Sequence, residues 1–146
     1  MATGTSPYQI VLADDHAILR QGLRRILQEE PGLEVVGEAA DGVELLNLLK
    51  LSKLQPHLVI LDISMPNLSG IEAARQIKAM RPETKILILS MHREKEYFSK
   101  AMSAGAEGYL LKDEADSELF SAINLIRQGG VYISSLITGN LEKGLP

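Results

Sequence analysis

The feature of the sequence that most constrains its fold is a repeated alternation of short apolar runs with amphipathic stretches. Two of the apolar runs, residues 59–61 and 86–89, contain no polar residue, so both faces of the strands that they predict must be covered. Such strands are typical of a parallel sheet buried between helices. Strands are predicted at residues 8–13, 33–38, 57–61, 85–90 and 106–111.

The stretches between the predicted strands carry apolar residues at helical spacing. A thinner apolar face at residues 94–104 predicts a weakly anchored helix, a candidate moving part. Because crossovers between parallel strands are right-handed, the pattern predicts an α/β fold: a doubly wound, five-stranded parallel sheet of order 2-1-3-4-5. The other helical stripes are Ile18, Leu19, Gly22, Leu23, Ile26 and Leu27; Val43, Leu46 and Leu49; Ile71, Ala74 and Ile77; and Leu119, Ala122, Ile123 and Ile126.

Composition favours a single domain, because 146 residues with 45% hydrophobic content suit one compact core. We expect this domain over residues 8–130, a disordered segment over 1–7, and a C-terminal tail or linker over 131–146. The net charge of −4 and the lack of a basic run argue against strong binding of nucleic acid or of a membrane. The absence of cysteine, of a signal peptide and of a long apolar stretch leads us to expect a cytoplasmic protein.

Polar residues follow the predicted strands at the ends that share one edge of the sheet. Asp14 and Asp15 follow the first strand, Asp62 the third and Lys112 the fifth, while Ser90 ends the fourth. Because ligands bind at this edge of a doubly wound sheet, we expect these side chains to converge. Three carboxylates would repel one another unless a cation lay among them, and oxygen ligands favour Mg²⁺ (or Mn²⁺).

One carboxylate in such a site can attack phosphorus and form an aspartyl phosphate, while the metal and a lysine neutralise the transferred oxygens. Each residue also has an ordinary structural explanation: Asp14 or Asp15 can cap a helix, and Asp62 can cap a turn. Taken singly, these explanations are favoured, but the joint occurrence of all the residue types at the right strand ends favours the site. The histidines His16, His57 and His92 are too scattered in sequence to predict a metal cluster.

These motifs together resemble the receiver domain of bacterial two-component response regulators, a CheY-like (βα)₅ fold, over residues 8 to about 130. The matching segments are residues 10–16, 58–66, 86–90 and 108–112. The resemblance implies these roles: Asp62 as phosphoacceptor, Asp14 and Asp15 as Mg²⁺ ligands, Ser64 as a ligand through its backbone carbonyl, Lys112 as the phosphoryl contact, Ser90 as the switch hydroxyl, Tyr109 as the aromatic that turns inward, and Gly70 as the small residue opening the third helix.

The sequence departs from the family pattern at two positions. Ser90 stands where many receivers have threonine, which keeps the hydroxyl but removes a methyl group. Asp113 follows Lys112 where many receivers have proline, so the cis peptide bond common there is not expected. From its position two residues after Ser90, we predict that His92 modulates hydrolysis of the acyl phosphate.

Residues 90–92, 105–108, 112–113 and 129–134 resemble the LuxR/NarL/FixJ-type subgroup, whose receivers precede a helix-turn-helix domain. The tail is too short to form that domain, so we expect DNA binding only through an output domain absent from this chain. The resemblance implies a sensor histidine kinase or a small phosphodonor as partner, homodimerisation on phosphorylation, and a switched surface at helix 4, strand 5 and helix 5. It implies no enzyme acting on an external substrate, only a protein that assists its own phosphorylation and dephosphorylation.

Three other classes of protein share parts of this pattern. A haloacid-dehalogenase-type phosphatase needs a second aspartate two residues after the nucleophile, where this sequence has Ser64. A flavodoxin-like electron carrier needs phosphate-binding donors after the first strand, where this sequence has Asp14 and Asp15. A receiver-fold interaction module that works without phosphorylation stays open as the main alternative.

Overall fold

The computed structural model describes residues 6–135 and residue 137. Residues 1–5, 136 and 138–146 lie outside the described part. They make up most of the predicted disordered segment 1–7 and most of the predicted tail 131–146. Among the described residues, no helix is long and apolar enough to cross a membrane.

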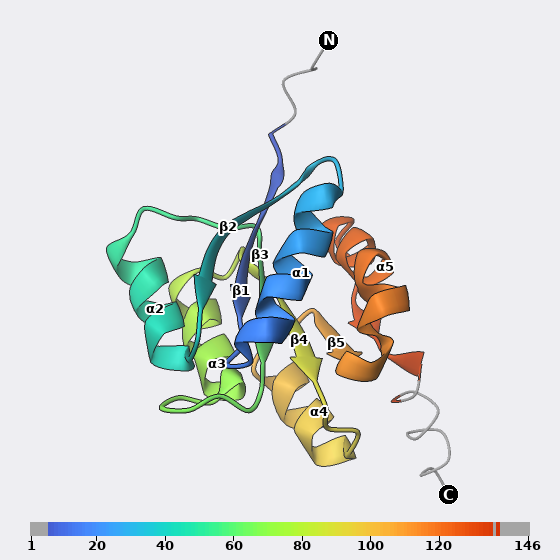
Figure 1. The fold of residues 1–146 in the computed structure, drawn as a ribbon. Coiled ribbons are helices and arrows are strands. Elements are labelled where there is room, and N and C mark those ends of the chain that lie inside the picture. Colours follow the sequence, from blue (N-terminus) through green and yellow to red (C-terminus); the bar gives the residue numbers. More distant parts are fainter. Residues whose placement is uncertain (1–5, 136, 138–146) are drawn as a thin grey trace, which may run out of the picture.

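The described chain alternates strands and helices, as the apolar pattern predicts (Figure 1). The strands are β1 (Tyr8–Ala13), β2 (Leu33–Ala39), β3 (Leu58–Asp62), β4 (Lys85–Ser90), β5 (Gly108–Leu111) and β6 (Tyr132–Ile133). The helices are α1 (Ala17–Glu29), α2 (Gly42–Leu51), α3 (Gly70–Met80), α4 (Lys95–Ser103), the 3₁₀ turn η1 (Lys112–Glu114) and α5 (Ala115–Arg127).

The sheet is parallel and has the order β2-β1-β3-β4-β5-β6. The five predicted strands and their order are confirmed, but the predicted strand number was wrong, because β6 pairs with β5 and adds a sixth strand. Tyr132 lies opposite Gly108, and Ile133 lies opposite Tyr109. This pairing covers an edge of β5 that would otherwise expose unpaired backbone groups. A strand of two residues is too short to produce a periodic signal in the sequence.

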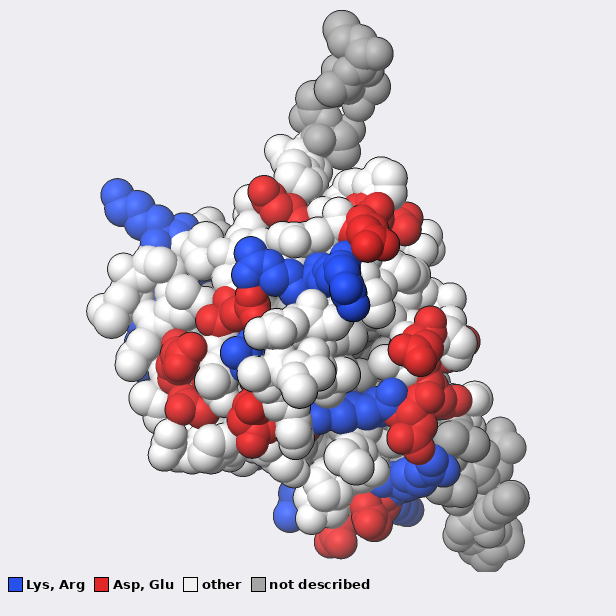
Figure 2. All heavy atoms as spheres, in the orientation of Figure 1, with Lys and Arg blue, Asp and Glu red and all other residues white. Residues whose placement is uncertain are grey.

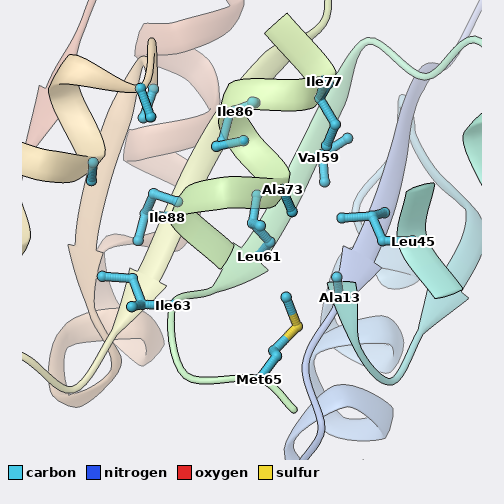
Figure 3. Packing of buried hydrophobic residues seen from close by; sticks show 14 of the residues in the cluster. Ala13, Leu45, Val59, Leu61, Ile63, Met65, Ala73, Ile77, Ile86 and Ile88 are labelled. Carbon is cyan, nitrogen blue, oxygen red and sulfur yellow. The ribbon is translucent and has the colours of Figure 1, made fainter. Parts of the chain in front are cut away.

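Helices cover both faces of the sheet: α1 and α5 lie on one face, and α2, α3 and α4 lie on the other (Figure 1). Successive strand residues point to opposite faces, so each central strand feeds both layers of the core. In β3, Leu58 and Ile60 join the cluster with α1 and α5, whereas Val59 and Leu61 join the cluster with α3. Figure 3 shows the second layer, in which side chains of β3 and β4 pack against α3. This double coverage explains the unbroken apolar runs.

The predicted helical stripes were partly wrong at their margins. In α1, Leu23 and Leu27 are buried, but Ile18 is 87% exposed and Ile26 is also exposed. Ile18 and Ile26 lie one residue, or about 100° of rotation, from the buried row, and α1 contacts the sheet with a single row of side chains. Val43 of α2 is exposed as well, although Leu46 and Leu49 are buried as expected.

On the face seen in Figure 2, basic side chains are interspersed with acidic ones.

Candidate acidic site at the carboxyl ends of the strands

The parallel strands bring the predicted polar residues to one edge of the sheet. Asp14 directly follows β1, Asp62 ends β3, Ser90 ends β4, and Lys112 directly follows β5. Asp14, Asp62 and Ser90 are buried. Burial is unusual for the two aspartate carboxylates. Asp14 and Asp62 therefore lie inside the rim of the sheet, whereas Asp15 is exposed to solvent.

Carboxylate oxygens of Asp14, Asp15 and Asp62 and a ring nitrogen of His16 all lie within 4.8 Å of one another. The backbone N–H of His16 donates to Asp14 Oδ1 at 2.8 Å, and His16 Nδ1 lies 3.0 Å from the same oxygen. Asp14 thus binds the backbone of His16, which is the N-cap residue of α1. The alternative explanation of Asp14 or Asp15 as the cap of this helix is wrong, because no side chain caps α1. The sequence prediction missed His16, whose only signal was its position directly after the acidic pair.

Lys112 connects two of the buried carboxylates. Its Nζ lies 3.1 Å from Asp14 Oδ2 and 3.2 Å from Asp62 Oδ2. The bond to Asp62 is a hydrogen bond, whereas the contact with Asp14 is an ion pair without hydrogen-bond geometry. Lys112 is itself mostly buried, so its charge acts on these carboxylates with little screening by solvent.

The donor set fits a divalent cation. Asp14 Oδ2 is buried and has no hydrogen-bond donor. The cluster holds three carboxylates and one lysine, so two negative charges have no lysine to balance them. Protonated His16 would balance one of these two charges. Burial raises the pKa of the Asp62 carboxyl, Lys112 opposes this increase, and the neighbouring Asp14 carboxylate adds to it. A hard cation bound by oxygen ligands would relieve both the repulsion and the missing hydrogen bond.

The loop after β3 approaches Asp62 closely. The backbone N–H of Ser64 donates to Asp62 Oδ1 at 3.3 Å. Gly70 begins α3, as expected, and a Cβ atom at this position would lie 1.9 Å from the carbonyl oxygen of Asp62. The residue must therefore be glycine for α3 to begin this close to the end of β3.

Ser90 and Tyr109 are in contact below the acidic cluster. The Tyr109 ring is fully buried, and its hydroxyl lies 3.1 Å from Ser90 Oγ and 2.8 Å from the carbonyl oxygen of His92. Burial raises the pKa of the Tyr109 hydroxyl, and the hydrogen bond to Ser90 partly offsets this. Ser90 Oγ also accepts from the backbone N–H of His92 at 2.9 Å. Tyr109 has one hydroxyl proton and the His92 carbonyl can only accept, so the Ser90 hydroxyl is the donor in its bond with Tyr109. The same proton can turn to a ligand instead.

His92 connects this pair to two other segments. Its Nε2 lies 3.0 Å from Ser64 Oγ in the loop after β3, and its ring stacks on Tyr97 of α4 at 4.0 Å between centroids. Phe98 of α4 meets Tyr109 edge to face at 5.6 Å. Two aromatic contacts therefore join the site to α4, the helix whose apolar face is thinnest.

A family model described as "Response regulator receiver domain" matches residues 10–124, and the chain belongs to this family. Its receiver is of the LuxR/NarL type, and its fold is the CheY-like parallel α/β fold. It is 40% identical over 135 residues to the transcriptional regulatory protein DegU of Brevibacillus brevis, which covers 92% of this chain and 56% of DegU. The chain thus spans just over half of the length of this relative.

Solved structures agree with the family. A LuxR-family two-component response regulator from Aurantimonas sp. SI85-9A1 superposes with a TM-score of 0.87 and 38% identity, covering 94% of this chain and 97% of that chain. The isolated receiver domain of RcsB from Salmonella enterica serovar Typhimurium, solved with the phosphomimetic BeF₃⁻, gives a TM-score of 0.83 and 30% identity over 91% and 97% of the two chains. RcsB has also been solved as dimers bound to DNA.

Proposed function

We propose that this receiver is a phosphorylation switch in which Asp62 accepts a phosphoryl group from a sensor histidine kinase or a small phosphodonor. The observation that carries the proposal is the position of Asp62: a buried carboxylate that contacts Lys112 and lies beside Asp14 and Asp15. A bound Mg²⁺ (or Mn²⁺), held by Asp14, Asp15, Asp62 and the carbonyl of Ser64, would supply charge neutralisation at the transferred phosphoryl group.

The chain's own residues account for the transfer. The ionised Asp62 carboxylate attacks phosphorus in line, a new O–P bond forms, and the bond to the donor's leaving group breaks, so the leaving group departs with its electron pair. Lys112 donates to Asp62 Oδ2, so its positive charge lies beside the oxygens of the phosphoryl group that Asp62 accepts. The Ser64 N–H holds Asp62 Oδ1 in place. Later attack of water on the acyl phosphate restores the carboxylate and releases phosphate. The protein thus assists its own modification and demodification without transforming an external substrate.

The signal passes through Ser90 and Tyr109. The Ser90 hydroxyl turns from Tyr109 and donates to a phosphoryl oxygen, which breaks its bond with Tyr109 while Ser90 Oγ still accepts from the His92 N–H. Because Tyr109 packs on Phe98 and His92 packs on Tyr97, the change alters the balance of conformations at the α4, β5 and α5 surface. That surface then changes its affinity for partners.

The relatives suggest the wider setting. DegU is described as a transcriptional regulatory protein, and RcsB forms dimers on DNA. We infer a cytoplasmic transcription regulator that homodimerises on phosphorylation and reaches DNA through a helix-turn-helix output domain that is not part of this sequence. The net charge of −4 agrees with a receiver that does not itself bind DNA or a membrane.

Intact-mass measurement tests the proposal. The chain is incubated with acetyl phosphate and Mg²⁺, and we expect a gain of one phosphoryl group that is lost when Mg²⁺ is omitted. The matched variants are Asp62→Asn, which should gain nothing, and Asp41→Asn, which removes one carboxylate outside the cluster and should gain normally. A gain that persists in Asp62→Asn would refute the assignment. No gain in the natural sequence would favour the phosphorylation-independent interaction module.

A further inference from the structure

The backbone of Asp14 is fixed on both sides to the end of β2. Its N–H donates to the carbonyl oxygen of Ala39 at 3.1 Å. Its own carbonyl oxygen accepts a hydrogen bond from the guanidinium of Arg20, one turn into α1. Arg20 Nε in turn donates to Glu38 Oε1 at 3.0 Å, and Glu38 precedes Ala39 on β2. These contacts form a closed ring of Asp14, Arg20, Glu38 and Ala39.

The ring is a specific one, because a guanidinium has several donors in a rigid plane and can bind a carbonyl and a carboxylate at once. The side chains of Arg20 and Glu38 are both mostly buried, at 17% and 22% exposure. Their hydrogen bonds are therefore shielded from competition with water. Arg20 and the Ala39 carbonyl together bind both backbone polar groups of Asp14, the residue whose carboxylate enters the cluster.

We propose that Arg20 is a positioning residue for the cation site: it holds Asp14 so that the buried Oδ2 atom, which has no hydrogen-bond donor, points to the shared acidic cluster. This inference rests on the proposed function, because it assumes that the cluster binds Mg²⁺. Arg20 would not be a ligand of the cation, because a guanidinium has donors and no acceptor. It acts through the backbone of Asp14.

Electrostatics alone predicts the opposite effect of removing Arg20. A positive charge beside an acidic cluster disfavours a second cation, so its loss should strengthen Mg²⁺ binding. Loss of positioning should weaken it, since residues that orient metal ligands typically contribute to metal affinity. The sign of the change therefore separates the two explanations.

Arg24 provides a matched control on the same helix. It pairs with the other carboxylate oxygen of Glu38, and its side chain is 46% exposed. Among the described residues, its guanidinium has no hydrogen bond to Asp14, so Arg24→Gln removes the same charge and the same kind of partner without releasing the Asp14 carbonyl.

The experiment measures Mg²⁺ dissociation constants by amide NMR titration of the natural chain, Arg20→Gln, Arg20→Lys and Arg24→Gln. We expect roughly tenfold weaker binding for Arg20→Gln, in the range found for residues that orient metal ligands. Arg20→Lys should also bind more weakly, because one ammonium cannot reproduce the planar fork. Arg24→Gln should stay within about twofold of the natural chain, since its exposed charge is screened.

A second measurement uses acetyl phosphate. The Mg²⁺ concentration for half-maximal phosphorylation should rise in Arg20→Gln, while the rate at saturating Mg²⁺ changes much less. Thermal unfolding checks the fold, and if Arg20→Gln is unfolded, Arg20→Lys decides. Binding by the Arg20 variants that is as tight as in the natural chain, or equal weakening in Arg24→Gln, overturns the inference and leaves the proposed function intact. Absence of Mg²⁺ binding in the natural chain would overturn both.

Discussion

The hydroxyl of Tyr109 lies 3.1 Å from Ser90 Oγ, and both side chains are fully buried. The bond joins the last residue of β4 to the second residue of β5, three positions before Lys112. A movement of Ser90 therefore acts directly on Tyr109, whose ring packs against Phe98 of α4.

Tyr109→Phe should uncouple the site from α4. The ring and its packing on Phe98 remain, but the hydrogen bonds to Ser90 and to the His92 carbonyl are lost, at a cost of roughly 1–3 kcal/mol in unfolding free energy. With beryllofluoride and Mg²⁺ present, we expect much smaller NMR shifts of α4 amides than in the natural chain. Tyr132→Phe, which loses a hydrogen bond to Glu118 instead, should keep the natural shifts. Equal α4 shifts in both variants would contradict the coupling.

Asp62→Asn should stabilise the fold at neutral pH when no divalent cation is present. The folded chain has a raised pKa at Asp62, with burial as the main cause, so the folded state holds this proton more tightly than the unfolded state. Ionisation of Asp62 therefore costs stability as the pH rises from the unfolded pKa through the raised folded pKa. We expect the gain in melting temperature to be complete above that window and to disappear below it.

Asp41→Asn is the control of opposite sign for the pH experiment. The pKa of Asp41 is lowered, chiefly by the backbone N–H of Glu44 and also by the side chain of Asn67. Its charge contributes stability above the unfolded pKa, and this contribution is lost as the pH falls through the lowered folded pKa. The variant should be less stable than the natural chain at neutral pH. The same direction of change in both variants would show that the cause is net charge and not the local environment.

Gly70→Ala should be strongly destabilising. The new Cβ would meet the Asp62 carbonyl oxygen and the Ile63 backbone, neither of which can move without shifting β3, so we expect a loss of about 3 kcal/mol or more in unfolding free energy. Gly22→Ala in α1 is the matched control: apart from its chain neighbours and the backbone of its own helix, no atom lies within 4 Å of its new Cβ, so it should gain roughly 0.5–1 kcal/mol from helix propensity. Urea unfolding measures both. Mild destabilisation by Gly70→Ala would show that the start of α3 is free to move.

Ser134→Ala should loosen the edge of the sheet beside the site. Ser134 is buried, its hydroxyl bonds the Glu114 carboxylate, and it accepts the backbone N–H of Leu111 at 3.2 Å. The variant leaves that N–H without a partner, at a cost of roughly 1–3 kcal/mol. Hydrogen exchange at Leu111 should become faster. Ser117→Ala, which loses only an exposed bond to the Glu114 carbonyl, should leave the exchange unchanged.

The fold was predictable from sequence where apolar periodicity is strong. The central strands show it most clearly, because residues such as Val59 and Ile60 face opposite, equally buried layers. The exposure of Ile18 was not predictable, since a helical stripe does not show how wide a contact its partner offers. The edge strand β6 was missed because a pairing of two residues is a tertiary event without a local signature.

The convergence of Asp14, Asp62 and Lys112 follows from strand order, and the structure brings these residues together. Their roles in phosphorylation remain predictions. The ring through Arg20 and Glu38 could not be predicted, because it depends on a turn of α1 meeting the end of a strand 18 residues away. Sequence spacing predicts which residues lie at the ends of the strands, but it does not predict which side chains hydrogen-bond to those residues.

The sixth strand has a mechanical consequence. The N–H of Tyr132 binds the carbonyl of Glu107, and the N–H of Ser134 binds the carbonyl of Tyr109. Tension along β6 would act on these bonds in shear, parallel to β5, and would load the strand that carries both Tyr109 and the turn at Lys112. Strain entering through this short edge strand would therefore load the backbone of Tyr109 directly, without passing through the acidic cluster.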